Sequence, residues 1–272
     1  MSEITGKELV EIVAHVREVT GIALDETKGY LLESRLRPLL ESFGIKSYRE
    51  LIAAAKKRLD INDALIDAIT THESHFFRDG HPFELFKNKL IPDMLKQNTG
   101  GNLYIASAAC AMGQEAYSMA MMLHQIPCNL VKNKIQILGY DISDQEVSRA
   151  TKGEYTRFEV SRGLDSVMVA QHFVKAGDIY RVKDELRAMV SFRKANLLSD
   201  SLGIPEFHII FCRNLANYFL PEDRIRLFGR LADRLVPGGV LVIGGSESLM
   251  GSVSDRFDRE KAHGSVFYRK RG

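Results

Sequence analysis

Residues Leu103–Glu115 (LYIASAACAMGQE) combine an apolar run with small side chains, a single glycine at Gly113 and an acid at Glu115. The apolar run predicts a β-strand, and Ala116–Leu123 predict a helix, so Gly113 falls in a strand-to-helix turn. Small residues let a ligand approach the backbone closely beside a helix N-terminus. Ligands of open α/β sheets bind beyond the carboxyl ends of the strands, next to such turns. We therefore expect a binding site at this turn.

A second acid, Asp141, ends the next apolar run, one strand–helix–strand unit after Gly113. A carboxylate in this place accepts hydrogen bonds from the two hydroxyls of an adenosine ribose. The alternative is structural, with Asp141 or Ser143 capping the following helix. The turn lacks the G-x-G-x-x-G of a dinucleotide site, which disfavours a nicotinamide oxidoreductase. S-adenosylmethionine, which carries adenosine without a phosphate, fits better.

The stretch Thr71–Arg78 (THESHFFR) holds the other candidate chemistry. His72, His75 and His81 invite a metal hypothesis, but H-E-x-H lacks the i, i+4 histidine pair of zinc metalloproteases, and we predict no metal. Arg78 follows two phenylalanines. This apolar setting favours an arginine that orients a carboxylate over one that forms a surface salt bridge.

Composition limits the function classes. The chain has 272 residues, 45% of them hydrophobic and 26% charged, with a net charge of +2, so nothing favours nucleic acid as a partner. Three cysteines without a Cys-x-x-Cys (Cys110, Cys128 and Cys212) predict buried thiols in a reducing compartment. Met1–Thr20 is charged and helix-periodic, unlike a signal peptide, and no apolar run has the length of a membrane span. We expect a cytoplasmic protein that does not insert into membranes.

Residues 1–70 predict a small domain of four amphipathic helices. The first and third begin at capping boxes, Thr5-x-x-Glu8 and Ser47-x-x-Glu50. The second contains a proline, which predicts a kink or break. The helices are expected from Thr5 to Gly21, over Glu26–Phe43 with the kink at Pro38, from Ser47 through Leu59, and over Asn62–Thr71.

Residues 71–98 predict a linker and a helix over His81–Lys96, broken near Pro92, and residues 99–272 then alternate strands with helices. This alternation predicts a mostly parallel, doubly wound sheet. The turn Pro237-Gly238-Gly239 feeds a late strand, and a small β insertion is expected at about 171–193. The strands are expected at Leu103–Ala106, Ile135–Tyr140, His208–Cys212, Val240–Gly244 and Ser265–Arg269, and the helices at about 114–124, 144–151, 162–172 and 221–235.

Six segments resemble, in order and spacing, the motifs of CheR-type chemotaxis receptor methyltransferases. They are THESHFFRDGHPFELF, ASAACAMGQEAYSMAM, ILGYDIS, VSFRKANLL, IIFCRNLANYF and LVPGGVLVIGGSESL, and together they span nearly the whole chain. The resemblance implies a Rossmann-like class I S-adenosylmethionine methyltransferase sheet with an antiparallel last strand, an all-α N-terminal domain and a small β insertion. It also implies methyl transfer from S-adenosyl-L-methionine to glutamate side chains of chemoreceptor cytoplasmic helices, leaving S-adenosyl-L-homocysteine.

The resemblance also implies roles for individual residues. Arg78 and Tyr218 lie near the reacting methyl group and are the candidate catalytic residues. The candidate cofactor-binding residues are His72, Ser74 and Arg78 at the methionine and methyl end, Glu115 and Asp141 at the amino group and ribose, Asn196 and Leu197 beside the adenine, and Arg213 and Asn214 after the fourth strand.

Three positions depart from the pattern of the family. His72 replaces an asparagine, AMGQEAY at Ala111–Tyr117 replaces Ser-Thr-Gly-Glu-Glu-Pro-Tyr, and Asn217 replaces an apolar residue. These departures motivate an alternative hypothesis, in which the protein is a sensor or adaptor that binds S-adenosylmethionine but has weakened turnover.

Two features concern partners. Lys28, Arg35 and Arg37 follow one predicted helix, either as a solvated face or as a docking surface for an acidic receptor helix. In the predicted β insertion, the link Lys175–Asp178 is short and resembles family members that do not bind the receptor's C-terminal pentapeptide. We therefore predict no tight pentapeptide binding, and we expect a monomer.

Overall fold

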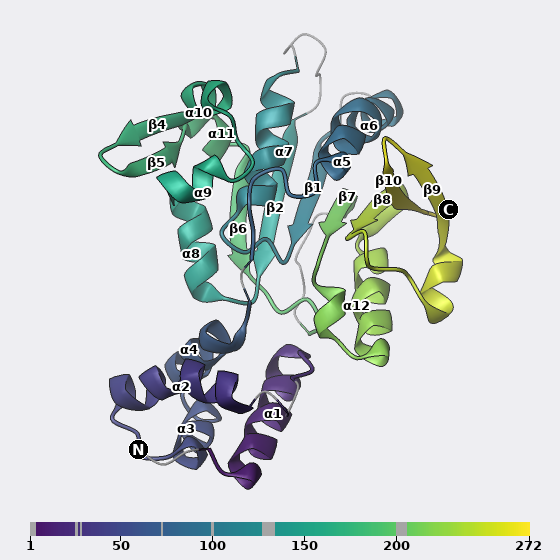
Figure 1. The fold of residues 1–272 in the computed structure, drawn as a ribbon. Helices are drawn as coiled ribbons and strands as arrows, with labels where there is room; N and C mark the ends of the chain where they lie inside the picture. The colour runs from purple at the N-terminus through teal and green to yellow at the C-terminus, as the bar shows by residue number, and fades with distance from the viewer. Residues whose placement is uncertain are drawn as a thin grey trace.

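The computed structural model describes residues 4–24, 27, 29–71, 73–98, 101–126, 134–199 and 206–272. Figure 1 shows three parts: a bundle of helices at the N-terminal end of the chain, a large twisted sheet with helices on both faces, and a small sheet beside helix α8. The bundle lies at the end of the large sheet toward which β1 and β2 point.

The N-terminal bundle has four helices and a hydrophobic core of its own. The side chain of Thr5 accepts from Glu8 N at the start of the first helix, which ends at Gly21 with φ 78°. The second helix runs on through Pro38, so the predicted break is wrong, and its described part starts at Gly29. The hydrophobic core of the bundle includes the fully buried Ile12 and Leu36. The four helices are α1 (Gly6–Thr20), α2 (Gly29–Phe43), α3 (Tyr48–Ala55) and α4 (Leu59–Ile69).

A continuous helical segment leads from the bundle to the large sheet. It consists of α5 (His81–Leu85), a π-helical turn η2 (Phe86–Leu90) and α6 (Ile91–Gln97). The predicted break near Pro92 is absent from this described segment. Ile91 N donates to Phe86 O, five residues back, and this wider turn relieves the clash that a proline ring makes with the carbonyl four residues before it.

The large sheet has seven strands in the order β6-β2-β1-β7-β8-β10-β9. The first five are parallel, and β10 is antiparallel to both β8 and β9, which confirms the predicted fold class. Chain order reverses around β1, the topological switch point at which doubly wound sheets bind ligands. The strands are β1 (Leu103–Ala108), β2 (Ile135–Asp141), β6 (Val190–Lys194), β7 (Phe207–Cys212), β8 (Leu235–Ile243), β9 (Phe257–Ala262) and β10 (Ser265–Lys270).

Both faces of the sheet are buried. Leu103 and Ile105 of β1 contribute to one core with α5–α6 and α7, whereas Ala106 and Ala108 contribute to the other core with α12. Side chains that alternate between two buried faces explain why the central strands are uniformly apolar. The helices of this region are α7 (Gln114–His124), α8 (Asp144–Lys152) and α12 (Pro221–Asp233), with 3₁₀ turns η4 (Ala216–Tyr218) and η5 (Gly251–Arg256).

The second sheet corrects the predicted β insertion at 171–193. Its three strands have the order β3-β5-β4, and β3 comes well before residue 171. The end of the predicted insertion belongs instead to β6, which pairs in parallel with β2 from Ile137↔Val190 to Asp141↔Lys194. The elements of this β-subdomain are β3 (Glu154–Thr156), α9 (Arg157–Ser161), α10 (Ser166–His172), β4 (Phe173–Ala176), β5 (Ile179–Val182) and α11 (Asp184–Arg187).

The predicted turn Pro237-Gly238-Gly239 lies inside β8. The register of β8 against β7 shifts there, and Gly238 takes φ 75°, so the turn is an irregularity within a strand. Among the described residues, no helix is long and apolar enough to cross a membrane.

Candidate functional site

A cavity of about 330 Å³ lies between the helical bundle and the carboxyl ends of the parallel strands. This volume is within the range of sites for small ligands. The segments after β1, β2, β6 and β7 form one wall, and the other is formed by residues 22–24, the start of α2, residues 69–71 and Glu73. A smaller pocket of about 40 Å³ adjoins the cavity, and Arg78, Arg213 and Asn214 line both.

Backbone strain is concentrated around the cavity. Among the described residues, six that are not glycine have positive φ, and five of these lie in the segments that form the site. Such conformations cost about 1–3 kcal/mol each and persist where the surrounding structure enforces them, often at functional sites. The five are Phe77, Asp79, Ala109, Ala111 and Asn214.

Asp141 lies at the tip of β2, almost fully buried, and lines the cavity. Its carboxylate accepts from Ala111 N at 2.8 Å and from Ser143 N at 3.0 Å. The helix cap proposed as the alternative role is supplied by Ser143, whose hydroxyl accepts from Glu146 N. A carboxylate can accept about four hydrogen bonds, so these two amides orient Asp141 without using its full capacity.

Glu115 and Arg213 belong to one buried network. Arg213 has a side chain that is 2% exposed, and it donates to Glu115 Oε2 at 3.0 Å and to Asp79 Oδ2 at 2.6 Å. Ser107 Oγ donates to the other oxygen of Glu115 at 2.8 Å. Arg213 also lies over the Phe83 ring. A buried arginine paired with two carboxylates is compensated electrostatically, so this network fixes the end of β7 against the first turn of α7.

The three residues Phe76, Phe77 and Arg78 point to three different parts of the molecule. Phe76 is fully buried against Tyr155 and Phe173 of the small sheet. Phe77 N donates to Ser118 Oγ at 3.0 Å. Arg78 lines the cavity, and its NH1 donates to Glu73 O at 2.7 Å. The backbone of this turn is therefore held by contacts on both sides. From it, the Arg78 guanidinium extends to the cavity.

The other end of the cavity is apolar and spans two parts of the chain. Asn196 Nδ2, on the segment after β6, donates to Val19 O of α1 at 2.8 Å. The buried Leu197 follows it and lines the cavity. Ala23 N, in the α1–α2 linker, donates to Tyr218 O at 2.8 Å. These contacts fix the end of α1 and Ala23 against the carboxyl ends of the parallel strands.

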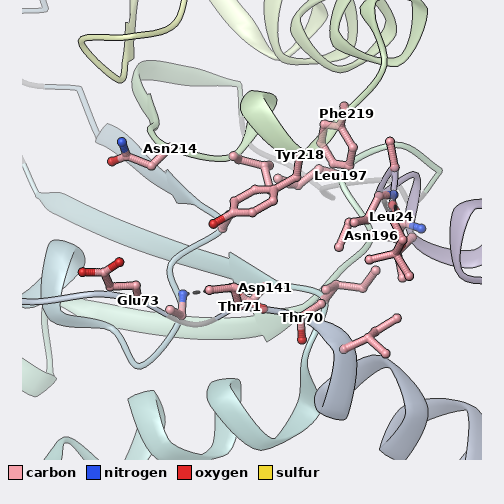
Figure 2. Close-up of a pocket in the computed structure, with 18 of the residues that line it drawn as sticks. Leu24, Thr70, Thr71, Glu73, Asp141, Asn196, Leu197, Asn214, Tyr218 and Phe219 are labelled. Carbon is pink, nitrogen blue, oxygen red and sulfur yellow. Dashed lines mark hydrogen bonds between the residues drawn. The ribbon is translucent and has the colours of Figure 1, made fainter. Parts of the chain in front are cut away.

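Tyr218 extends over the cavity from η4. Figure 2 shows its ring between Asn214 at one end and Leu197 and Asn196 at the other, with Asp141 below it in this view. The residue is 41% exposed, so the phenol closes the cavity on its solvent side.

Glu247 is a site residue for which the sequence predicted no role. Its carboxylate accepts from Asn214 N at 2.9 Å, from Ala216 N at 2.7 Å and from Gly244 N at 2.6 Å. It thus fixes the backbone between β7 and η4, on which Asn214 and Tyr218 are carried. The signal for Glu247 in the sequence was its place in the motif segment GGSESL.

Most of the predicted site residues lie together, and some do not. The cavity is lined by Arg78, Asp141, Asn196, Leu197, Arg213, Asn214 and Tyr218, and the smaller pocket by Ser74, Arg78, Glu115, Arg213 and Asn214. Arg35, predicted to dock a partner, is exposed on α2 and also lines the cavity, and its NH1 donates to Ile69 O at 2.8 Å, so its docking role stays a prediction. Arg37 pairs on the surface with Glu33. His72 and Lys28 lie outside the described residues.

Titration behaviour does not favour a protein nucleophile in the site. Burial raises the pKa of the Cys110 and Cys212 thiols well above the ordinary value, and these two residues are free cysteines. The pKa of His75 is lowered, first by burial and then by the charges of Arg162 and Arg78. At neutral pH the smaller pocket thus contains one protonated thiol, Cys110, and the neutral imidazole of His75, and Cys212 at the end of β7 is protonated as well.

Family models agree with this arrangement. Residues 7–70 match the model described as "CheR methyltransferase, all-alpha domain", and residues 72–266 match "CheR methyltransferase, SAM binding domain". The chain belongs to the CheR methyltransferase family.

Relatives extend over nearly the full length of this CheR methyltransferase. It is 36% identical to the chemotaxis protein methyltransferase Cher2 of Pseudomonas putida, over 93% of this chain and 94% of that protein. It is 33% identical to chemotaxis protein methyltransferase 1 of Vibrio cholerae, over 98% of each. Among solved structures, the N-methyltransferase NodS of Bradyrhizobium japonicum aligns with a TM-score of 0.39 and 13% identity, over 71% of this chain and 99% of that chain. The family and these two relatives establish S-adenosylmethionine-dependent methylation in chemotaxis, and nothing favours the alternative of an adaptor with weakened turnover.

The residues present fit S-adenosylmethionine. The cavity has an apolar end of the size and character that a purine ring requires, and an oriented carboxylate, Asp141, lies at its centre. The adjoining pocket contains a further carboxylate, Glu115, and the guanidinium of Arg213. The aminoacyl group of the cofactor is a zwitterion, with an ammonium and a carboxylate, and both signs of charge are present in this pocket for it.

Proposed function

We propose that this methyltransferase esterifies glutamate side chains on the cytoplasmic helices of chemotaxis receptors, giving glutamate methyl esters. The observation that carries the proposal is the state of Arg78. Within the described part of the chain Arg78 forms no ion pair, because its guanidinium donates to the carbonyl of Glu73, while the nearby acids Glu115 and Asp79 pair with Arg213. A half-buried guanidinium at the cavity can therefore receive a carboxylate from outside the protein.

Methyl transfer to a carboxylate requires little proton transfer by the enzyme. A glutamate carboxylate is ionised at neutral pH, since its ordinary pKa is about 4.3. When bound, S-adenosylmethionine would supply an electrophilic methyl group on its sulfonium, and S-adenosyl-L-homocysteine would be the leaving group. No general base is required, which agrees with the protonated Cys110 thiol and the neutral His75 imidazole in the smaller pocket.

Arg78 and Tyr218 would do the work of positioning. Bringing a carboxylate into a closed site costs several kcal/mol unless the charge is paired, and Arg78 offsets that cost. Tyr218 is placed to donate a second, neutral hydrogen bond from the rim of the cavity. Alignment of the reacting atoms can supply roughly 7–11 kcal/mol of the barrier reduction.

For the cofactor, we assign the apolar end to the adenine, beside Asn196 and Leu197, and the centre to the ribose, whose hydroxyls would donate to Asp141. The smaller pocket would hold the aminoacyl group with Glu115 and Ser74. The positions of Arg213 and Asn214 on both pockets support a role where the two groups join. His72 belongs to the same proposed set by the family resemblance alone.

We retain the predicted boundaries as a proposal: a receptor-facing helical domain over 1–70, a linker and helix over 71–98, and the methyltransferase domain over 99–272. Lys28, Arg35 and Arg37 remain candidates for contact with an acidic receptor helix, and Arg35 also lines the cavity. Because the substrate helices are cytoplasmic, the enzyme would act in the cytoplasm, as a monomer.

The short hairpin link between β4 and β5 supports the proposal that the β-subdomain does not bind a receptor C-terminal pentapeptide tightly. A calorimetric titration with such a peptide should give no binding at micromolar concentrations. Saturable micromolar binding would remove this part of the proposal.

The deciding experiment uses S-adenosylmethionine labelled in the methyl group and receptor cytoplasmic fragments. We expect label on the fragment that alkali releases as methanol, as a carboxylate methyl ester would, and loss of labelling when the acceptor glutamates are replaced by alanine. Labelling that resists alkali would assign the methyl group to nitrogen or carbon and overturn the glutamate assignment.

A further inference from the structure

The turn that carries Arg78 is attached to the β-subdomain through its neighbour Phe76. The Phe76 ring makes edge contacts with Tyr155 of β3 at 5.0 Å and with Phe173 of β4 at 5.6 Å between centroids. Tyr155 Oη in turn donates to Met112 O, in the turn after β1, at 2.7 Å. Phe76 is thus enclosed in the same core as the small sheet and the cofactor turn.

The connector between α9 and α10, residues 162–165, lies directly against the backbone of the turn that carries Phe76 and Arg78. Gly163 has φ 99°, and a methyl group built on it would collide with the carbonyl oxygen of Phe76 and lie 2.8 Å from the carbonyl carbon. The connector therefore approaches Phe76 as closely as two backbones can, which only glycine allows.

The connector also contacts the turn through charge. Arg162 NH2 lies 3.6 Å from Glu73 Oε1, and it is the carbonyl of Glu73 that accepts from Arg78. The two side chains of the ion pair are 41% and 61% exposed, so this contact is weak in water. The backbone contact at Gly163 is therefore the stronger of the two restraints.

We infer that Gly163 is a positioning residue for methyl transfer: with the β-subdomain, it fixes the backbone of Phe76 and thereby sets where the Arg78 guanidinium lies. This inference rests on the proposed role of Arg78 in orienting the acceptor carboxylate. It gives the β-subdomain a task in the reaction that does not depend on binding a receptor tail.

The size of the effect follows from the tolerance of an aligned reaction. A displacement of about 1 Å at a reacting group can cost on the order of 10²-fold in rate. Adding a methyl group at Gly163 forces the backbone of Phe76 to move, because a carbonyl cannot give way as the end of a flexible side chain can. The cavity wall on the side of Asp141 and Leu197 is not part of this contact.

The test compares Gly163→Ala with Gly177→Ala. Gly177 lies in the β4–β5 hairpin of the same subdomain with φ 62°, and a methyl group there meets no described atom within 4 Å. Both variants place alanine in the left-handed region, so the control carries the conformational strain without the collision. We expect kcat for methyl transfer to fall on the order of 10²-fold for Gly163→Ala and to change less than about twofold for Gly177→Ala.

Three further readouts separate positioning from a general loss of structure. The affinity for S-adenosyl-L-homocysteine and the KM for S-adenosylmethionine should change far less than kcat, since the assigned adenine and ribose contacts at Leu197 and Asp141 lie outside this turn and only the contact with Ser74 lies beside it. In an Arg78→Ala background, Gly163→Ala should produce no further loss. Amide hydrogen exchange of residues 73–80 should quicken in Gly163→Ala and not in Gly177→Ala. If Gly163→Ala does not fold, Phe173→Leu serves instead, with a smaller loss of kcat and faster exchange in the same segment.

An unchanged kcat for Gly163→Ala, an equal loss in Gly177→Ala, or a loss that adds fully to that of Arg78→Ala would overturn the inference. Failure of the proposed function gives a different result. In that case the wild-type enzyme would not methylate receptor glutamates at all, while the difference in hydrogen exchange between the two glycine variants would still report the backbone contact.

Discussion

The helical bundle and the β-subdomain both border the site, but they are attached to the large sheet in different ways. The bundle has a hydrophobic core of its own and meets the sheet mainly through polar contacts such as Asn196–Val19 and Ala23–Tyr218, with Ile22 as an apolar side chain that packs against both cores. The β-subdomain shares its core with the sheet, because Tyr155, Phe173 and Phe76 belong to the cluster that also contains Ile105. The bundle is thus joined to the large sheet mainly by polar contacts, and the β-subdomain is joined to it by shared aromatic packing.

This difference assigns the two neighbours different tasks. Individual hydrogen bonds contribute about 0.5–1.5 kcal/mol each, so the bundle can shift relative to the sheet at modest cost and admit a ligand of the size of the cavity. Shared aromatic packing is rigid by comparison. The apolar end of the cavity therefore lies at an adjustable boundary, and Arg78 lies at a rigid one.

The largest expected effect is on stability. Phe76→Ala should lower the free energy of unfolding of the methyltransferase domain by about 3–5 kcal/mol, because it leaves a cavity in the shared core. Leu36→Ala, in the core of the bundle, should cost about 2–5 kcal/mol there and leave the sheet protected. The chain contains no tryptophan, so regional hydrogen exchange is the suitable measurement. Equal loss of protection in all regions of both variants would contradict the distinction.

The second prediction concerns turnover at the rigid boundary. Arg78→Ala should reduce kcat by on the order of 10²-fold or more while the fold survives, since only a half-buried side chain is removed and orientation is lost. Methyl transfer to a receptor fragment measures it. Near wild-type turnover would remove Arg78 from the mechanism.

Asp141→Ala is the matched variant on the cofactor side. It should weaken binding of S-adenosyl-L-homocysteine by roughly 1.5–3 kcal/mol, the scale of a hydrogen bond to a charged group. Calorimetry measures the loss directly. An unchanged affinity would leave Asp141 as a structural residue that only orients Ala111 and Ser143.

The fold was predictable where hydrophobic periodicity determines it. Buried strands such as Ile135–Asp141 are mostly apolar runs of the length of a strand, and this pattern favours a strand between two turns. The edge strand Phe257–Ala262 was missed because its sequence, FDREKA, is mostly charged, as befits a strand with only one neighbour. Val190–Lys194 was misassigned because its alternating pattern suits an edge of either sheet.

A site residue was predictable where it belongs to a motif at the end of a strand and its own side chain faces the site. Asp141 and Glu115 are of this kind. The hydrogen bond from Arg35 to Ile69 O was not predictable, because helical spacing gives the face of α2 but not the element that the face meets. Glu247 and Gly163 act on the backbone of segments remote in sequence, and no spacing rule reports such contacts.

The third prediction tests the adjustable boundary. Asn196→Ala removes the hydrogen bond to Val19 O and should cost about 0.5–1.5 kcal/mol of the contact between bundle and sheet. We expect faster hydrogen exchange in the α1–α2 linker and a correspondingly weaker affinity for S-adenosyl-L-homocysteine. Unchanged exchange in the linker would mean that the bundle is held by other contacts.

The smallest effect is a pH dependence that distinguishes the buried histidines of the two regions. His15 of the bundle contacts Asn62 Oδ1, whereas His172 of the β-subdomain is fully buried with no described hydrogen-bond partner on either ring nitrogen. The groups that face His172 are His124 of α7, Lys183 and Glu185. Burial, aided by the charges of His124 and Lys183, lowers the pKa of His172 below the ordinary value near 6.5.

The sign of the effect follows from linkage. Above pH 6.5 both folded and unfolded chains hold His172 neutral, and below it the unfolded chain takes up the proton first, so stability falls as pH falls. His172→Leu should therefore lose part of the wild-type decline in unfolding free energy between pH 6.5 and 5, by at most about 1.4 kcal/mol per pH unit. Phe173, the neighbour of His172, packs against Phe76, so the same acidification should quicken exchange at residues 73–80 more in the wild type than in His172→Leu. An equal response of the two proteins would refute the role of His172.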